Sequence, residues 1–376
     1  MSESLPVAVT GMSIMTALGR GPSAQLSGTP AFAEVTRFDT SNRRTHHAAI
    51  AADAGTLEEE LDQAIAEACA QAGVDRNTTP LLLALHEPPT RDFGQLRTYT
   101  SACVSATTAL ADAATLIRLG RLDRVVVAAA YLVEPYQYAL FDTGRALSTD
   151  GAVRPFSLNR TGTLLGDGVA AVVLQPGEGL AQLLACSRTG DAHHPVQPAP
   201  NGQGLTTAIQ SALHKAGLAP ADIGYVNANA TGTTYADAAE SAALTRAFDG
   251  LTHRSEGSTP GARGGDPQRD GLTHQAGPEG AVRALAGRAG WGGPAVSSTK
   301  GVHGHALEAS GLVEFVVTVA ALRSGKLPVN AGFLEADPPC GVDLILDAPR
   351  LVSSPYAMSL NSAFGGANTA LVVRVG

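Results

Sequence analysis

The chain has 376 residues, of which 44% are hydrophobic and 16% charged, and its formal net charge is -8 at neutral pH. A chain of this length can build an apolar core without a disulfide or metal staple, and its acidic balance argues against a general nucleic-acid binder. The four cysteines lie far apart without zinc-site spacing, and the chain has no run of about 18 apolar residues. We therefore expect no metal, no disulfide framework, no membrane span and no leader peptide, and a cytoplasmic protein.

Continuous apolar runs, which are typical of buried strands, alternate with amphipathic helical patterns through the first half of the chain. The elements expected there, in chain order, are a strand over 6–10, a helix over 57–72, a short apolar run over 81–85, a helix from Cys103 to Leu119, and strands over 124–130 and 168–175.

The second half repeats this alternation. One helical pattern ends at Gly217, which suits the left-handed position that follows many helix ends. Strands that alternate with helices predict an α/β fold with a buried sheet. The elements expected there are helices over 205–216, 236–248 and 309–322, and strands over 225–228 and 369–375.

Two segments in different halves of the chain have a similar pattern. LLGDGVAAVVLQ at 164–175 and AFGGANTALVVRV at 363–375 both place two glycines just before an apolar strand. We infer an internal duplication, with halves at 1–177 and 178–376.

One stretch interrupts the second half. Residues 250–293 are rich in Gly, Pro and Arg and have little apolar periodicity, so we expect a flexible surface insertion. The sequence DGLTH occurs twice in this region and ends at His253 and His274. Joint metal binding by these histidines is one interpretation, and a short duplicated piece of loop is the interpretation we favour.

Cys103 is a candidate nucleophile. It lies within SACVSA at 101–106, at the expected start of a helix. A helix N-terminus favours a thiolate, and small neighbours leave room for a substrate and for backbone N–H donors. A buried structural cysteine is the alternative interpretation of this segment by itself.

Four further segments accompany this cysteine in a fixed order. They are PFSLNRTG at 155–162 with GDG at 166–168, YVNANATGT at 225–233, SSTK at 297–300 followed by Gly304, His305 and Glu314, and NSAFGGAN at 361–368. With SACVSA, this order and spacing resemble the β-ketoacyl synthase (ketosynthase) family of the thiolase superfamily, over nearly the whole chain. The resemblance implies a thiolase-like duplicated αβαβα five-layer fold, usually dimeric, that works without a cofactor.

The resemblance also implies roles for individual residues. Cys103 matches the nucleophile that takes an acyl group from an acyl carrier protein or CoA, and His305 matches the second family histidine. Lys300 and Glu314 match the buried pair that supports this histidine. Phe364 matches the aromatic residue of the GFGG turn, whose backbone N–H forms an oxyanion hole with that of the cysteine.

The chain departs from the family pattern at important positions. Asn229 stands where the family motif HGTGT has its first histidine, while Thr231 and Thr233 keep the motif's substrate-side threonines. Asparagine donates a hydrogen bond but cannot become cationic or relay a proton. In addition, Ala363 replaces the first glycine of the GFGG turn, and the stretch 20–100 looks short in the region that supplies part of the family's acyl pocket and dimer contact.

Other polar residues have simpler interpretations. His303 either substitutes for the missing histidine or, as we favour, has a surface or supporting role. Asp167 is expected to accept backbone N–H groups in its glycine turn. The cysteines expected to serve packing are Cys69, Cys186 and Cys340. The histidines expected to face solvent are His46, His47, His193 and His194. Three arginines either meet an acidic carrier protein or end a solvated helix, namely Arg118, Arg121 and Arg124.

The resemblance leads to one main functional hypothesis. The chain is expected to load an acyl group from an acyl carrier protein onto Cys103 and to transfer it, by decarboxylative condensation with a malonyl thioester, in polyketide or fatty-acid biosynthesis. The alternatives are a non-condensing transacylase or hydrolase, and a non-catalytic partner subunit like a chain-length factor. The expected assembly is a homodimer or a heterodimer with another ketosynthase-like chain.

Overall fold

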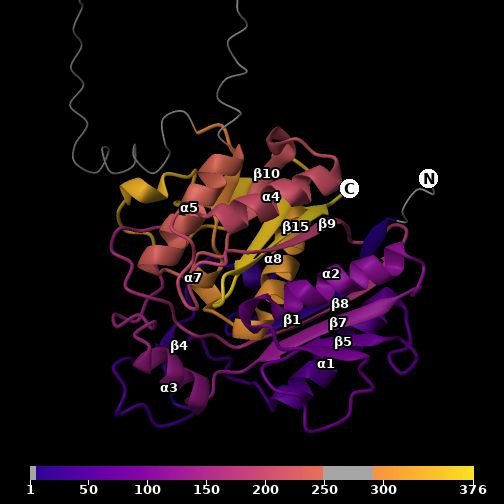
Figure 1. Ribbon diagram of the computed structural model, residues 1–376. Helices are drawn as coiled ribbons and strands as arrows, with labels where there is room; N and C mark the ends of the chain where they lie inside the picture. Colours follow the sequence, from indigo (N-terminus) through magenta and orange to yellow (C-terminus); the bar gives the residue numbers. More distant parts are fainter. Residues whose placement is uncertain (1–5, 249–290) are drawn as a thin grey trace, which may run out of the picture.

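The computed structural model describes residues 6–248 and 291–376, and its long strands fall into two groups (Figure 1). The first group is β1 (Val7–Thr16), β5 (Leu81–Ala84), β6 (Arg97–Tyr99), β7 (Val125–Tyr131) and β8 (Gly168–Pro176). The second group is β9 (Ala181–Gly190), β10 (Ile223–Asn227), β11 (Ala295–Ser297), β14 (Tyr356–Ser362) and β15 (Ala367–Arg374). The short strands are β2 (Gly19–Arg20), β3 (Ala33–Glu34), β4 (His47–Ala48), β12 (Lys326–Leu327) and β13 (Arg350–Leu351).

The two groups repeat one topology. The strand order is β6-β5-β7-β8-β1 in the first and β11-β10-β14-β15-β9 in the second, and the groups meet where β1 pairs briefly with β9. From the outer edge inward, both groups have two parallel pairings and then two antiparallel ones. The same order with the same directions is what a duplicated fold requires, and it confirms the predicted fold class.

Helices cover both faces of each group of strands (Figure 1). The α-helices are α1 (Leu57–Ala72), α2 (Ser105–Arg118), α3 (Pro135–Thr143), α4 (Gln203–Ala216), α5 (Thr234–Phe248), α7 (Lys300–His303) and α8 (Ser310–Ser324). The 3-10 turns are η1 (Ala24–Leu26), η2 (Ala102–Val104), η3 (Pro220–Asp222), η5 (Leu307–Ala309) and η6 (Pro338–Cys340). Helix α1 lies outside the first group, α4 and α5 lie outside the second, and α2 and α8 lie between the groups, which gives five layers.

Strand β7 illustrates how the layers are held together. Val125, Val127 and Ala129 point into the central core with α2 and α8, whereas Val126 and Ala128 point into the separate core beneath α1. A strand buried on both faces reads as a continuous apolar run, which is why the sequence shows no alternation here.

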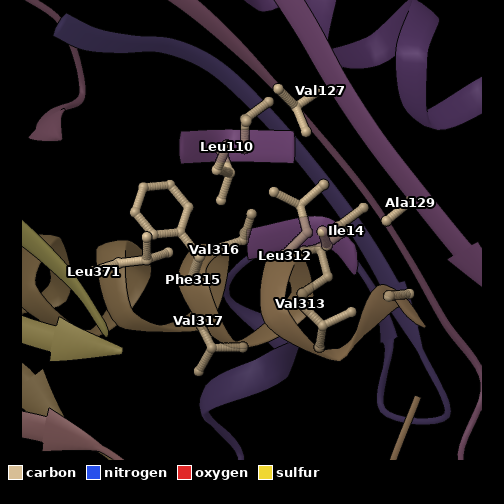
Figure 2. Packing of buried hydrophobic residues seen from close by; sticks show 14 of the residues in the cluster. Ile14, Leu110, Val127, Ala129, Leu312, Val313, Phe315, Val316, Val317 and Leu371 are labelled. Carbon is tan, nitrogen blue, oxygen red and sulfur yellow. The ribbon is translucent and has the colours of Figure 1, made fainter. Parts of the chain in front are cut away.

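Helix α8 is buried on all sides. Every residue from Ser310 to Leu322 is buried, and the helix packs against strands of both groups and against α2. Figure 2 shows side chains of this helix among Ile14 of β1, Val127 of β7 and Leu371 of β15. A helix in this position has no polar face, so the two halves share one apolar core across it.

The structure corrects the first predicted strand. It does not stop before Gly11 but continues to Thr16, with a shift in register between Val9 and Gly11. A Cβ at Gly11 would lie 2.0 Å from the backbone oxygen of Ala68, so this glycine allows α1 to pack closely and does not end the strand. The predicted helices and the other predicted strands are found with small shifts of their ends. Helix α3 and the longer strands β6, β9, β11 and β14 were not predicted.

The proposed division at 177/178 lies between the end of β8 at Pro176 and the start of β9 at Ala181. That the two halves are separate domains divided at this boundary remains a proposal. Nearly all of the predicted insertion at 250–293, with His253 and His274, lies outside the described residues. Over the part of the chain that the structure describes, no helix has the length and apolarity needed to cross a bilayer.

The shared core makes Phe315 a sensitive position. Its side chain is fully buried in α8 between the two groups of strands. We expect Phe315→Ala to lower the free energy of unfolding by about 3–5 kcal/mol, because it removes buried apolar area and leaves a cavity. Urea unfolding followed by circular dichroism measures this change. Leu351→Ala, at a position that is 73% exposed, is the control, and equal midpoints for the two variants would contradict the shared core.

Candidate active site

Cys103 lies in the turn η2, between the edge strand β6 and helix α2. Ala102, just before it, has φ +52°, a left-handed conformation that is uncommon for residues other than glycine. Cys103 itself is 7% exposed and lines a pocket. The strained residue therefore marks the turn that directs the thiol toward this pocket.

His305 is the direct partner of the cysteine. Its Nε2 lies 3.1 Å from Cys103 Sγ, and its Nδ1 lies 2.8 Å from Ser310 Oγ. The Ser310 oxygen also accepts the backbone N–H of Ala306 at 3.0 Å. Because both ring nitrogens have partners, the imidazole is held in one orientation beside the thiol.

The glycine turn at 166–168 supports this histidine from the other half of the chain. The backbone of Leu165 pairs with that of His305, and a Cβ at Gly166 would lie 1.9 Å from the backbone oxygen of His303. Asp167 accepts the backbone N–H groups of Ala51 and Val133 at 2.9 and 2.7 Å, as expected for a structural acid, and also pairs with Arg37.

Burial keeps the thiol and the imidazole neutral. Burial raises the pKa of Cys103 to about 12, and the charge of Glu308 adds to this rise. Burial also lowers the pKa of His305 well below its usual value, and Lys300 and His303 add to that shift. The expectation that the helix N-terminus favours a resting thiolate is therefore wrong, because the loss of water around the sulfur outweighs the modest effect of a helix end.

Asn229 occupies the third corner of the site. It lines the same pocket as Cys103 and His305, and its Oδ1 lies 3.3 Å from Lys300 Nζ. Lys300 donates to the carboxamide oxygen, and within 6–248 and 291–376 Nδ2 has no acceptor, so its two N–H groups can donate to a ligand.

The buried base of the site is an ion pair. Lys300 and Glu314 form a salt bridge with both side chains fully buried, and Asn361 Nδ2 donates to the second carboxylate oxygen. The structure thus brings Cys103, His305, Asn229, Lys300 and Glu314 together, from both halves of the chain.

Two acids of α5 were missed by the sequence analysis. Asp237 accepts the backbone N–H groups of Phe156, Thr231 and Gly232, and Glu240 accepts that of Asn229 at 2.7 Å. Burial raises the pKa of Asp237 to about 6 and that of Glu240 to about 8. Two acids three residues apart in an alanine-rich helix were the available signal, since they share one helix face.

The pocket in front of Cys103 has a volume of about 380 Å³. Thr231 and Thr233 line it, with their hydroxyl oxygens 3.1 Å apart. Phe364 lines it from the turn after β14, stacked on Phe141 with ring centroids 5.8 Å apart. Among the described residues the backbone N–H of Phe364 has no acceptor, as an oxyanion-hole donor requires.

The remaining candidates lie away from the chemistry. His303 is fully buried, so the surface alternative is wrong, and its ring bonds Gly304 O and Thr299 Oγ1 at 2.8 and 3.0 Å instead of lining the pocket. Arg118 donates to the carbonyl groups of Leu183 and Leu184, which is a structural role. Four free cysteines are present, and the three besides Cys103 are buried or half-buried, namely Cys69, Cys186 and Cys340. The expected surface residues are exposed or half-buried, namely His46, His47, His193, His194, Arg121 and Arg124.

Comparison with known families agrees with this geometry. The N-terminal domain model of the β-ketoacyl synthases matches residues 94–179, and the C-terminal domain model matches residues 180–259 and 279–334. Together these matches cover more than half of the chain, which therefore belongs to the β-ketoacyl synthase family.

Sequence relatives of this chain also carry names from this family. The chain is 32% identical over 286 residues to 3-oxoacyl-(acyl-carrier-protein) synthase 2 of Mycobacterium tuberculosis. It is 29% identical over 296 residues to a yeast (Saccharomyces cerevisiae) protein named as a homolog of that synthase. The alignments cover 72% and 75% of this chain, but only 59% of each relative.

Solved structures show the same fold at lower identity. The ishigamide ketosynthase/chain length factor superposes with a TM-score of 0.79 at 20% identity, and a β-ketoacyl synthase from Burkholderia phymatum with 0.78 at 24%. Each alignment covers 99% of this chain and 100% of the other. A third neighbour, a type II polyketide acyl-carrier protein in complex with its ketosynthase, has a TM-score of 0.79 at 18% identity over 100% of both chains.

The buried ion pair gives a first prediction for the site. We expect Lys300→Met to lower the free energy of unfolding by about 3–5 kcal/mol, because it leaves Glu314 buried without a counter-charge. Glu314→Gln in the same chain should restore part of this loss. A double-mutant cycle by urea unfolding measures the coupling, and two effects that simply add within about 0.5 kcal/mol would contradict it.

Glu240 gives a prediction for pH dependence. Its pKa rises from 4.5 to about 8 on folding, so the unfolded chain releases a proton that the folded chain keeps. The free energy of unfolding should therefore fall as pH rises from about 4.5 to about 8, and Glu240→Gln should remove this loss. The advantage of the variant should grow over this window by an amount on the order of a few kcal/mol.

Urea unfolding at a series of pH values checks this expectation. The exposed residue Glu178 provides the matched control Glu178→Gln. Parallel stability curves for wild type and Glu240→Gln would show that Glu240 ionises normally.

Proposed function

We propose that this chain is a ketosynthase-type acyltransferase that carries its acyl group on Cys103. The observation that carries the proposal is the contact of 3.1 Å between Cys103 Sγ and His305 Nε2 at the end of a pocket. Relatives named 3-oxoacyl-(acyl-carrier-protein) synthase support an acyl carrier protein as donor.

The first half-reaction is transfer of the acyl group to the cysteine. The Cys103 thiol passes its proton to His305 Nε2 as the sulfur attacks the thioester carbonyl carbon, because a neutral imidazole beside a neutral thiol is ready to accept it. The backbone N–H groups of Cys103 and Phe364 stabilise the tetrahedral oxyanion. The bond to the carrier sulfur then breaks, and the leaving thiolate takes the proton from His305.

The second half-reaction we propose is condensation with a malonyl thioester. The malonyl carboxylate leaves as CO2, and the resulting enolate carbon attacks the acyl carbon and releases the Cys103 sulfur as a thiolate. This thiolate takes a proton from water and returns to the neutral thiol. In our proposal the thioester oxygen accepts hydrogen bonds from Asn229 Nδ2 and from His305 in the tautomer that carries its proton on Nε2. Asn229 stabilises this oxygen less than a cationic histidine would, so we expect slow condensation.

Asn229 also favours a second candidate, a non-condensing transacylase or hydrolase. Such an enzyme needs only the nucleophile, its base and the oxyanion hole, and it transfers the acyl group to another nucleophile or to water. A non-catalytic partner subunit is less well supported, because such a subunit needs neither Cys103 nor its contact with His305.

The assembly is also a proposal. The neighbours include a ketosynthase/chain length factor and an acyl-carrier protein bound to its ketosynthase. We propose a dimer, either of this chain or with a related one, that accepts an acyl carrier protein at the pocket mouth.

Intact-protein mass spectrometry after mixing with acyl-carrier thioesters tests the proposal. Wild type and Cys186→Ala should gain the mass of the acyl group, and Cys103→Ala should not. Malonyl-carrier is then added, and a β-keto product shows condensation, whereas loss of the acyl group without that product shows transfer or hydrolysis.

Asn229→His should raise the condensation rate at least about tenfold, since it supplies the missing acid–base group. A folded wild-type chain that is never acylated would overturn the catalytic proposal.

A further inference from the structure

A buried carboxyl group belongs to a turn that packs against the turn of the nucleophile. Glu308 belongs to η5, which packs against the Cys103 turn and against β7. Its Oε1 lies 3.0 Å from Nδ1 of His86, a side chain that is 40% exposed. Its Oε2 is buried and has no hydrogen-bond partner among the described residues, although Glu308 as a whole is only 5% exposed.

A second buried polar group without a partner lies in the same place. Tyr131, the last residue of β7, is 3% exposed, and within the described residues its hydroxyl has no hydrogen-bond partner. The turn η5 that carries Glu308 packs against β7, which ends at Tyr131, and against η2, which carries Cys103, so the three residues lie in one region of the fold. The turn that carries Glu308 is also strained, since Leu307 has φ +42°.

Two unsatisfied polar groups beside a nucleophile call for an explanation. Each costs about 1–3 kcal/mol when it stays buried without a hydrogen bond. No described hydrogen bond of the free chain compensates for this, whereas a ligand with a suitable donor would satisfy the Glu308 oxygen and could accept from or donate to the tyrosine hydroxyl. Groups left unpaired in the free state are common at functional sites.

We propose that Glu308 and Tyr131 are specificity-determining residues that bind the acyl group carried by Cys103, and that this acyl group bears a hydroxyl or ammonium hydrogen-bond donor. The inference rests on the proposed acylation of Cys103 and names the class of acyl group. A carboxylate oxygen accepts from either donor, and His86 keeps the carboxylate oriented. An alkyl chain would leave both polar groups unpaired, so the site disfavours it.

The test compares rates of Cys103 acylation with matched carrier thioesters. The probes are 3-hydroxybutyryl-carrier, 3-aminobutyryl-carrier and butyryl-carrier, which differ only at the third carbon. We expect wild type to prefer one of the two polar acyl groups over butyryl by at least about tenfold, the ratio that one charged hydrogen bond provides. The two polar probes distinguish a hydroxyl donor from an ammonium donor.

The variants are Glu308→Met, which keeps the length of the side chain, and Tyr131→Phe, which removes only the hydroxyl. Both variants should bring the ratio of the polar-probe rate to the butyryl rate close to one. Glu178→Met, at an exposed position, should leave this ratio unchanged. The ratio of rates is compared because loss of the Glu308 charge also lowers the pKa of Cys103 and should accelerate acylation by every probe. Circular dichroism melting establishes that each variant is folded.

Two outcomes separate this inference from the proposed function. If wild type is acylated as fast by butyryl as by the polar probes, the inference is overturned, while acylation of Cys103 stands. If no probe acylates folded wild-type protein, both proposals fail. A wild-type preference that Glu308→Met leaves unchanged would also overturn the inference.

Discussion

The structure depends on the burial of α8 between the two groups of strands. A helix surrounded by strands and another helix has no face on which to carry a charge, yet Glu314 lies within it. That charge is tolerable only because Lys300 and Asn361 meet it. Lys300 begins α7, and the short connection from there to α8 contains His305 and Glu308. The requirement to neutralise one buried acid thus fixes the turn that carries the histidine.

The site is a neutral one at rest. The burial that holds the two halves together also removes water from the Cys103 thiol and the His305 imidazole. It raises the pKa of the thiol and lowers that of the imidazole, so both groups are neutral in the free chain. In the function we propose, proton transfer from Cys103 to His305 therefore accompanies attack on the thioester. Asn229, which lines the same pocket, is also uncharged and contributes hydrogen-bonding groups only. Within the function we propose, acyl transfer requires less of this site than condensation does.

The surroundings of Cys103 differ on its two sides. Toward the pocket lie small residues, threonines and the stacked rings of Phe141 and Phe364, which suit a thioester arm. Toward η5 lie the unpaired carboxyl oxygen of Glu308 and the hydroxyl of Tyr131. In the further inference proposed above, selection of the acyl group is assigned to the Glu308 side of the nucleophile.

The sequence by itself determined the class of fold, the order of most elements and the residues at the centre of the site. Apolar runs and glycine turns report local conformation directly, and the resemblance of five ordered motifs to the ketosynthase family singled out the candidates Cys103, His305, Asn229, Lys300 and Glu314. Tertiary structure decided the rest. Gly11 looked like the end of a strand because its contact with α1 involves a residue 57 positions away. Burial and partners distant in sequence, which no local pattern records, decided three further features. These are the protonation of Cys103, the role of Asp237 and Glu240, and the position of Glu308.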